Sequence, residues 1–400
     1  MTGPQRPAPE QPWIPFAGLR ANAPRLLFGG LLLAGLWLLP DLTPPATAPS
    51  PVELARGRIE AIAPPPPLPS ADPSASADPN PPNVGLGTAT VRILTGPSRG
   101  TAMEVALQGP SGSTEIPDYR VGDEIIVSVS NSPDGTFAAV SDRWRGPVLA
   151  FTLMLFGLVV TLVGGWHGVR SLVALALTLG VVIRVVVPLL LAGWQPVPLA
   201  VLAGSAVTLA SLVLTEGWRP STGAAAVGTF LALAVTAALA ALTTSLAMFT
   251  PGQGNDATQY LTTIGRTDLD IGGLLLAAVI FGTLGVLDDV TVTQAVMVDE
   301  LAAADPSLSR AALFGRAMRV GRSHIGATVN TLFLAYAGAS LPLLVLLAAG
   351  GQDPLLIASG ETIAVEIVRA LVGSVGIVTA VPLTTAIAVA VARRGAIRAV

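Results

Sequence analysis

Two adjacent carboxylates, Asp288 and Asp289, stand in a stretch that is otherwise as apolar as a membrane span. An ionised side chain in hydrocarbon costs roughly 2.5–3.5 kcal/mol on insertion scales, so such groups persist mainly where they face a protein interior or a water-filled path. On an α-helix Asp289 shares one face with Gly282, Gly285 and Thr293. Glycines beside a carboxylate and a hydroxyl are typical of a polar seam between packed helices.

The depth of this pair in a membrane has two interpretations. About twenty residues cross a bilayer, so a span that starts at Ile271 leaves both carboxylates near its far rim. The apolar run nevertheless continues to Val298, which favours a tilted or broken helix that holds the pair deeper. A rim position predicts a capping or helix-packing role, and a deep position predicts a site for a cation or a substrate.

Arg184 is another charge inside an apolar stretch, residues 171–192. Because a guanidinium avoids lipid, we expect it to meet a carboxylate, and Asp289, Asp288 and Glu366 are the candidates. The alternative is a side chain that extends its charged end toward the nearer headgroups.

Further polar residues in or beside the apolar stretches are secondary candidates: Glu361, Glu366, Arg369, Thr331 and His324. Glu366 and Arg369 stand three residues apart and can pair along one helix, either as an interfacial anchor or as part of a site. Asn330 brings an amide into the start of a span, where it serves a site or bridges neighbouring helices by hydrogen bonds.

The composition is that of an integral membrane protein, because 52% of the 400 residues are hydrophobic and only 12% are charged. A net charge of −3 gives no reason to expect a nucleic-acid partner. The chain has no Cys and two His, so we expect no disulfide, no metal site and no cofactor. It also has no Lys, which excludes a P-loop for nucleotide phosphates.

The N-terminal part of the chain divides into segments by composition. Residues 1–25 are a Pro-rich tail that we expect in the cytoplasm, and residues 26–39 form a short apolar run. That length suits a signal-peptide core or an uncleaved signal anchor, and we favour the anchor. Residues 40–83 are dominated by Pro, Ala and Ser, which predicts an extended extracytoplasmic tether.

Residues 84–145 have a different pattern, in which apolar and polar residues alternate with a period near two. The alternation covers residues 88–95, 101–107, 123–129 and 136–141, and turn-forming Gly, Pro and Ser separate these runs. We therefore predict a small β module, a five-stranded barrel of OB or SH3 type. Such a barrel binds a ligand or a partner, or serves only as structure.

Seven apolar stretches follow the β module: 147–165, 171–192, 197–214, 222–250, 271–298, 325–349 and 363–391. They predict a seven-helix transmembrane bundle over residues 146–392 and a cytoplasmic tail over 393–400; with the N-terminal run there are eight spans. The basic segment 311–322 resembles an amphipathic helix that lies on the cytoplasmic face. The short loops that this order places outside hold only Arg266, as the positive-inside rule requires.

Two blocks of the sequence resemble the YibE/F-like family of bacterial multi-pass membrane proteins. In the first, residues 282–293, Asp289 matches an intramembrane aspartate of the family and Thr293 matches the hydroxyl that follows it. The second block is residues 321–342, and its matching positions are Asn330, Thr331, Tyr336 and Pro342.

The resemblance covers about residues 84–391, and the Glu366–Arg369 pair and residues 376–384 also agree. Ser323 departs from it, because an acidic residue is expected there. The resemblance implies a membrane protein with an extracytoplasmic β module and a helical bundle. It implies no particular activity or substrate.

The function that these observations favour is a gradient-driven permease or channel-like transporter. Asp289 is the expected proton or cation site, shaped by the following residues: Asp288, Thr293, Thr291, Asn330 and Arg184. The alternative is a membrane-anchored scaffold or sensor whose β module binds an envelope partner. An intramembrane aspartyl hydrolase is disfavoured, because neighbouring residues of a helix point about 100° apart, and we expect no enzymatic activity.

The expected partners are the lipid bilayer, an unidentified small solute or ion, an envelope protein or cell-wall component, and further copies of the chain. The expected location is the bacterial plasma membrane. Both termini are then cytoplasmic and the β module is extracytoplasmic.

Overall fold

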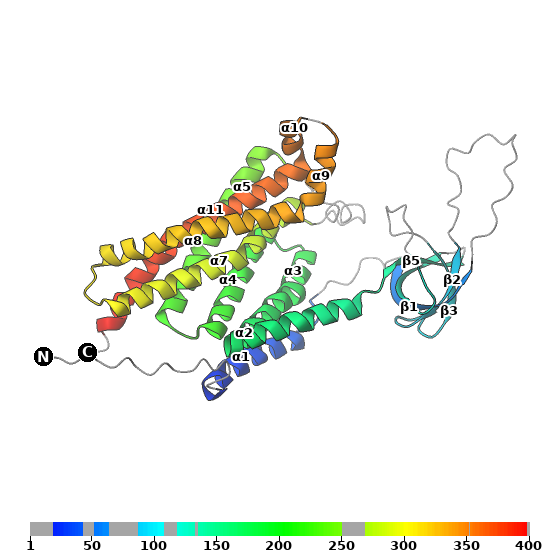
Figure 1. The fold of residues 1–400 in the computed structure, drawn as a ribbon, viewed down its shortest axis with the longest axis horizontal. Helices are drawn as coiled ribbons and strands as arrows, with labels where there is room; N and C mark the ends of the chain where they lie inside the picture. The colour runs from blue at the N-terminus through cyan, green and yellow to red at the C-terminus, as the bar shows by residue number, and fades with distance from the viewer. Residues whose placement is uncertain are drawn as a thin grey trace. The chain divides into compact units, whose positions relative to one another are not determined.

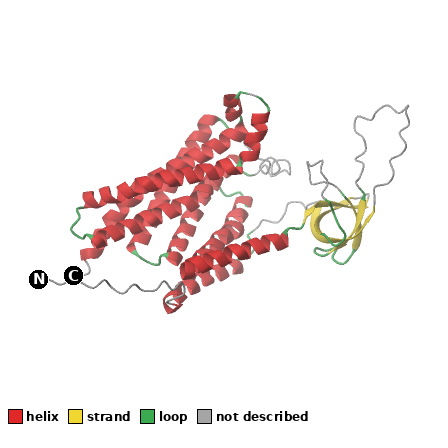
Figure 2. Cartoon of the chain, viewed as in Figure 1, coloured by secondary structure: helices red, strands yellow, loops and turns green. Residues whose placement is uncertain are grey.

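The computed structural model describes residues 19–42, 52–63, 87–107, 118–132, 135–249, 269–351 and 353–397. The chain forms two compact units (Figure 2). One comprises residues 45–156 and contains the five described strands, and the other comprises residues 1–44 and 157–400 and, where described, is helical. Most of the predicted N-terminal tail and the last residues of the predicted C-terminal tail lie outside the described residues.

The strands close into a small barrel in the order β1-β2-β3-β5-β4 (Figure 1). They are β1 (Val52–Ala63), β2 (Thr88–Ile93), β3 (Ala102–Ala106), β4 (Glu124–Ser132) and β5 (Gly135–Arg143). All neighbours pair antiparallel except β3 and β5, which pair in parallel at Ala106 and Ala139. Inward-facing residues such as Val91, Val105, Ile125 and Val127 are fully buried, so the predicted five-stranded barrel is confirmed.

Strand β1 lies where the sequence predicted a tether, and that part of the prediction is wrong. It pairs with β2 on one side and with β4 on the other. The inward side chains are small, Ala55 and Gly57 before Ile59, so the apolar alternation is weak in the sequence. Gly57 is required there, because an added Cβ would overlap the Val91 side chain. The Pro-rich segment 64–86, outside the described residues, therefore connects β1 to β2 instead of leading to the module.

Among the described residues, five segments are long and apolar enough to cross a membrane: Gly146–Leu191, Pro196–Thr215, Pro220–Ala247, Ile271–Ala304 and Glu361–Ala392. The elements, in chain order, are α1 (Leu19–Leu38), α2 (Gly146–Val181), the π-helical turn η1 (Val182–Val186), α3 (Val187–Leu191), α4 (Pro196–Thr215), α5 (Pro220–Ala247), α7 (Ile271–Ala304), α8 (Arg310–Ala339), α9 (Leu341–Ala349), α10 (Pro354–Ser359) and α11 (Glu361–Ile397). These apolar helices and the composition are those of a membrane protein.

Helix α2 is broken at Gly165, whose φ of 54° and ψ of −135° are not helical. An added Cβ at Gly168 would overlap the carbonyl of Val160, and one at Gly157 would lie 3.9 Å from the Leu172 side chain. Residues fifteen apart in a straight helix are separated by about 22 Å, so the chain folds back at Gly165. The predicted spans 147–165 and 171–192 are thus the two arms of this break.

Arg170 fastens the tip of this hairpin to the end of α4. Its side chain is buried, Nη1 donates to the Thr215 carbonyl at 2.7 Å and Nε donates to the Trp166 carbonyl at 3.2 Å. Nη2 lies 2.7 Å from His167 Nδ1. A guanidinium at the carbonyl end of a helix is also favoured by the helix dipole.

Helix α8 differs from its prediction. The sequence predicted a basic interfacial segment over 311–322 and a separate span over 325–349. Instead α8 runs without a break from Arg310, where the Ser309 hydroxyl accepts a hydrogen bond from the Ala312 N–H at 3.2 Å, to Ala339. No proline interrupts this sequence, and the chain breaks at Ser340 before α9, which contains Pro342. Helix α8 is not one of the five long apolar segments.

The core of the helical unit lies between α5, α7 and α11, where Ile280, Leu287, Leu233, Ile377 and Val381 are fully buried. Glycines allow these helices to approach closely. An added Cβ at Gly376 would overlap Thr236 Oγ1, one at Gly228 would overlap Thr384 Oγ1, and one at Gly373 would overlap Thr283 Cγ2. Hydroxyl-bearing residues thus pack against glycines across the interfaces.

We predict that Gly376→Ala and Gly228→Ala destabilise the helical unit by about 1–3 kcal/mol each, because the new methyl group displaces a threonine in a packed core. Thermal unfolding of the purified protein in detergent checks this. Gly285→Ala and Gly223→Ala are matched controls, since nothing lies within 4 Å of a Cβ at either position. Equal melting temperatures for the four variants would contradict the packing described here.

Candidate functional site

The face of α7 that is buried is opposite to the face that the sequence predicted to pack against other helices. Asp289 is exposed, as are Gly282 and Gly285 on the same face. The buried polar residues of α7 are Thr283, Thr291 and Gln294. The prediction that Asp289 lies in a seam between packed helices is therefore wrong, because Leu287, Val290 and their apolar neighbours turn the other face inward.

Thr291 and Gln294 are hydrogen-bonded within the core. Thr291 Oγ1 donates to the Asp288 carbonyl at 3.1 Å and lies 2.7 Å from Thr229 Oγ1 of α5. Since a hydroxyl has one hydrogen, Thr229 is the donor between the two threonines. Gln294 Nε2 donates to Thr385 Oγ1 of α11 at 2.8 Å and to the Ala317 carbonyl of α8 at 3.2 Å.

Asp288 is the carboxylate that points into the unit. Its residue is half-buried, and its Oδ1 atom is buried without a hydrogen-bond partner among the described residues. Thr384 Oγ1 of α11 and Thr208 Oγ1 of α4 share this condition. Buried polar atoms are nearly always hydrogen-bonded, so these oxygens call for an explanation.

Thr208 and Asp288 lie at the same level of two parallel neighbouring helices. At one end, a Cβ added at Gly273 of α7 would lie 3.1 Å from Pro196 of α4. Further along, a Cβ added at Gly204 of α4 would lie 3.4 Å from Leu284 of α7. Thr208 and Asp288 each follow four residues later.

Beyond them, Leu212 of α4 and Ala295 of α7 belong to one buried cluster. We name the following residues the polar layer: Thr208, Thr229, Asp288, Thr291, Gln294, Thr384 and Thr385. Within this layer, Asp288 and Thr208 offer a carboxylate and a hydroxyl oxygen to a proton or a small cation.

The contacts that place Arg184 are with the end of α1 and not with Asp288, Asp289 or Glu366. Arg184 lies in the π-helical turn η1, and its Nη2 donates to the carbonyl of Leu39 at 2.9 Å, just beyond the end of α1. Its guanidinium also stands 5.8 Å from the ring centroid of Trp37. The predicted pairing with Asp289, Asp288 or Glu366 is wrong, because this arm of the hairpin faces α1.

The other predicted residues lie apart from the polar layer. Thr293 is half-buried, while Asn330 and Thr331 are exposed on α8. Thr331 Oγ1 donates to the Ala327 carbonyl of its own helix at 2.9 Å, so it bridges no helices. His324 is half-buried, and its Nε2 has no hydrogen-bond partner in the part of the chain that the structure describes.

The predicted Glu366–Arg369 pair is confirmed. Arg369 Nη1 lies 2.8 Å and 3.0 Å from the two carboxylate oxygens of Glu366. Glu366 also lines a cavity of about 510 Å³ between α8, α9, α10 and α11. Glu361 is the first residue of α11, where a negative charge is favoured by the helix dipole.

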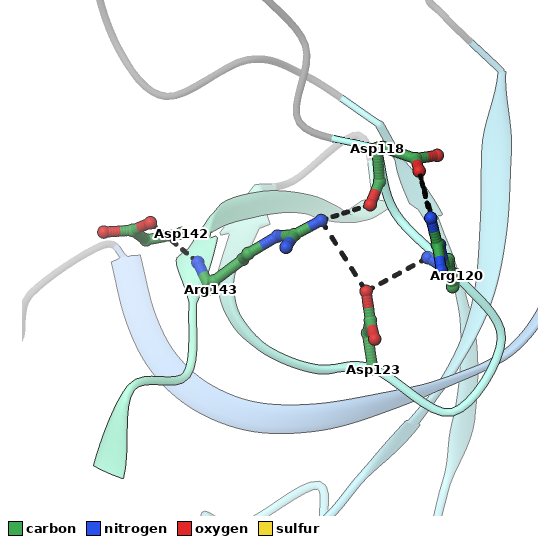
Figure 3. Close-up of polar contacts among 5 residues, drawn as sticks. All are labelled: Asp118, Arg120, Asp123, Asp142 and Arg143. Carbon is green, nitrogen blue, oxygen red and sulfur yellow. Dashed lines mark hydrogen bonds and ion pairs between the residues drawn. The ribbon is translucent and has the colours of Figure 1, made fainter. Parts of the chain in front are cut away.

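The barrel has its own polar cluster around Arg143, at the end of β5 (Figure 3). Arg143 donates to the carbonyl of Asp118 and lies 3.7 Å from the Asp123 carboxylate. Its guanidinium is 5.3 Å from the ring centroid of Tyr119. These contacts fasten the segment before β4 to the end of β5.

Two neighbouring groups of this cluster have perturbed proton affinities. A hydrogen bond from Arg145 holds the pKa of Asp142 below its ordinary value, and the backbone N–H of Arg143 adds to this effect. Burial raises the pKa of Tyr119. The charges of the cluster largely compensate one another. Over the described residues of both units, no group of three or more His, Asp or Glu is placed to hold a metal ion.

Sequence reasoning missed most of the polar layer, although the sequence carries a signal for part of it. Thr222, Thr229, Thr236 and Thr243 recur every seventh residue on α5, which is the spacing of one helix face. Thr208 and Thr384 have no such pattern. Only the packing of α4 and α11 against the other helices brings them into the layer.

A family model described as YibE/F-like protein matches residues 152–394. The match includes every residue of the polar layer and the residues that line the cavity. Neither the comparison with curated proteins nor the comparison with solved structures finds a match.

We predict that Arg143→Ala loosens the barrel locally, because it removes the contacts with Asp118, Asp123 and Tyr119. The expected cost is about 1 kcal/mol, seen as faster amide hydrogen exchange over residues 118–125 of the full chain. Arg92→Ala is the control, since its ion pair with Glu60 is exposed and such pairs contribute little. Equal exchange rates in the two variants would show that Arg143 does not hold the segment before β4 against the end of β5.

We predict that Asp288→Asn stabilises the protein by about 1–3 kcal/mol, because a neutral amide is less costly to bury than an unpaired carboxylate. Asp289→Asn is the neighbouring control at an exposed position, with an expected change within about 0.5 kcal/mol. Thermal unfolding in detergent measures both. A loss of stability in Asp288→Asn alone would mean that the carboxylate already has a strong partner.

Proposed function

The chain belongs to the YibE/F-like family, and we propose that it is a gradient-driven membrane transporter whose polar layer binds a proton or a small cation. Asp288 is the central group of the proposed site. The observation that carries the proposal is its buried Oδ1, without a hydrogen-bond partner among the described residues, at the level of the unpaired hydroxyl of Thr208. A site that binds a small ion must keep oxygen atoms free of permanent partners.

The proposal moves the central role from Asp289 to Asp288. Asp289 is exposed on the surface of the helical unit, so it is not shielded from its surroundings as a coupling site must be. Asp288 gains or loses a proton, or pairs with a cation, and its charge changes in an apolar environment where that change has a large energetic effect. Thr208, at the same level of α4, supplies an oxygen that stabilises the bound ion.

An ion gradient is the energy source that the chain itself supports. Without Lys it contains no P-loop. A change of charge at Asp288 favours different packings of α4, α5, α7 and α11 in its two states. The close contacts of glycines with threonines between α5, α7 and α11 transmit such a change.

The proposed setting is the bacterial plasma membrane, with both termini in the cytoplasm and the barrel outside. The distribution of Arg supports this orientation: Arg310, Arg316, Arg319 and Arg322 gather at the start of α8, and cytoplasmic loops are enriched in such residues.

The test is flux across proteoliposomes of the purified protein under proton, sodium, potassium and divalent-cation gradients. The wild type is expected to pass one of these ions. The flux through Asp288→Asn is expected to be at least about tenfold lower. Asp289→Asn is the matched control and is expected to retain most of it. Flux that depends on Asp289 and not on Asp288 would overturn the assignment, and no flux from folded wild type would overturn the function.

A second candidate is a membrane-anchored scaffold or sensor whose barrel binds an envelope partner. Its support is the strand order with β3 parallel to β5, which is the order of OB-type barrels, a class that includes many binding modules. Sedimentation of the full chain with purified cell-wall material tests this candidate. Binding that Arg58→Glu or Arg92→Glu on the barrel surface abolishes would favour it.

A further inference from the structure

The cavity between α8, α9, α10 and α11 is large enough to hold a small molecule. Its volume of about 510 Å³ falls within the range of about 300–1,000 Å³ that is usual for ligand sites. Its wall is mainly apolar, with Phe333 and Leu344 on one side and Ile357, Ile363 and Ile367 on the other. The cavity shares no residue with the polar layer, so a ligand in the cavity is independent of the proposed ion site.

Small residues and helix breaks create the cavity. Ala337, Ala348, Ala358 and Ala370 line it, one from each of the four surrounding helices. The chain breaks at Ser340 and again at Gly360, where α10 ends. The short helices α9 and α10 therefore stand over a space that these alanines do not fill.

The chemistry of the wall excludes a strongly charged occupant. Its ionised group, Glu366, is already bound to Arg369 through both carboxylate oxygens. The remaining lining is alkyl or aromatic apart from the hydroxyls of Tyr336 and Ser340. An occupant gains most by burying hydrocarbon, at roughly 25 cal/mol per Å².

The rim of the cavity leads to the surroundings of the helical unit. Phe333, Leu344 and Ile367 line the cavity and are also 50%, 40% and 38% exposed. Ile363, Ile367 and Ala370 belong to α11, one of the helices long and apolar enough to cross a membrane. In the membrane setting proposed above, the molecules beside this rim are lipids.

We propose that this cavity binds an acyl chain of a membrane phospholipid. The chain enters past Phe333 and Ile367 and lies along the alanines of the wall. The neutral Glu366–Arg369 pair forms the polar boundary of the site. The bound chain holds α9 and α10 against α11.

The test is native mass spectrometry of the full chain, stripped of lipid in detergent and titrated with dioleoylphosphatidylglycerol. Ala337→Phe and Ala358→Phe place a ring in the cavity, and each is expected to weaken binding of one lipid by about tenfold. Ala327→Phe is the matched control, since Ala327 is exposed on α8 outside the cavity. Thermal unfolding verifies that all variants are folded.

Binding that is the same in the wild type and in both cavity variants would overturn the proposal, as would the absence of a retained lipid in the wild type. Oleate alone is the second probe. If oleate binds in a way that Ala337→Phe abolishes and the phospholipid does not bind, the ligand is a free fatty acid and the proposed source is wrong.

Discussion

Polar groups buried between apolar helices must find hydrogen-bond partners inside the protein, and the packing of this helical unit depends on that constraint. Thr236, Thr283 and Thr385 meet it locally, because each hydroxyl donates to the carbonyl four residues earlier in its own helix. Their side chains then occupy little space, and glycines on the facing helices fit against Thr236 and Thr283. Hydrogen bonding within each helix and close approach between helices thus support each other.

Asp288, Thr208 and Thr384 are exceptions to this rule. Each has a buried oxygen that no described residue satisfies, while the nearby Thr229–Thr291 and Gln294–Thr385 pairs are complete. The unpaired oxygens therefore lie beside side chains whose hydrogen bonds are complete. Such side chains keep the positions of the unpaired oxygens defined, which is the condition for binding a small ion selectively.

The cavity near α9 and α10 follows the opposite principle. Around the polar layer, glycines bring helices together, whereas around the cavity alanines and helix breaks keep them apart. The same small residue types thus have two effects, which depend on whether a neighbouring helix can reach them. The connections decide this, because the two breaks at Ser340 and Gly360 prevent α8 and α11 from being joined by a tight turn.

Features that arise from local periodicity and composition can be read from the amino-acid order alone. The membrane class follows from the length of apolar runs, the barrel from the alternation in β2 to β5, and the Glu366–Arg369 pair from a spacing of three on one helix. The remaining features depend on contacts between distant segments. Asp288 and Asp289 are equally polar neighbours, and only the packing of α4, α5 and α11 around α7 selects which carboxylate points inward. Strand β1 and the partner of Arg184 depend in the same way on distant segments, since β2 and β4 define the strand and α1 supplies the carbonyl. Whether a side chain is buried depends on the segments that pack against it, and these segments lie far from it in the sequence.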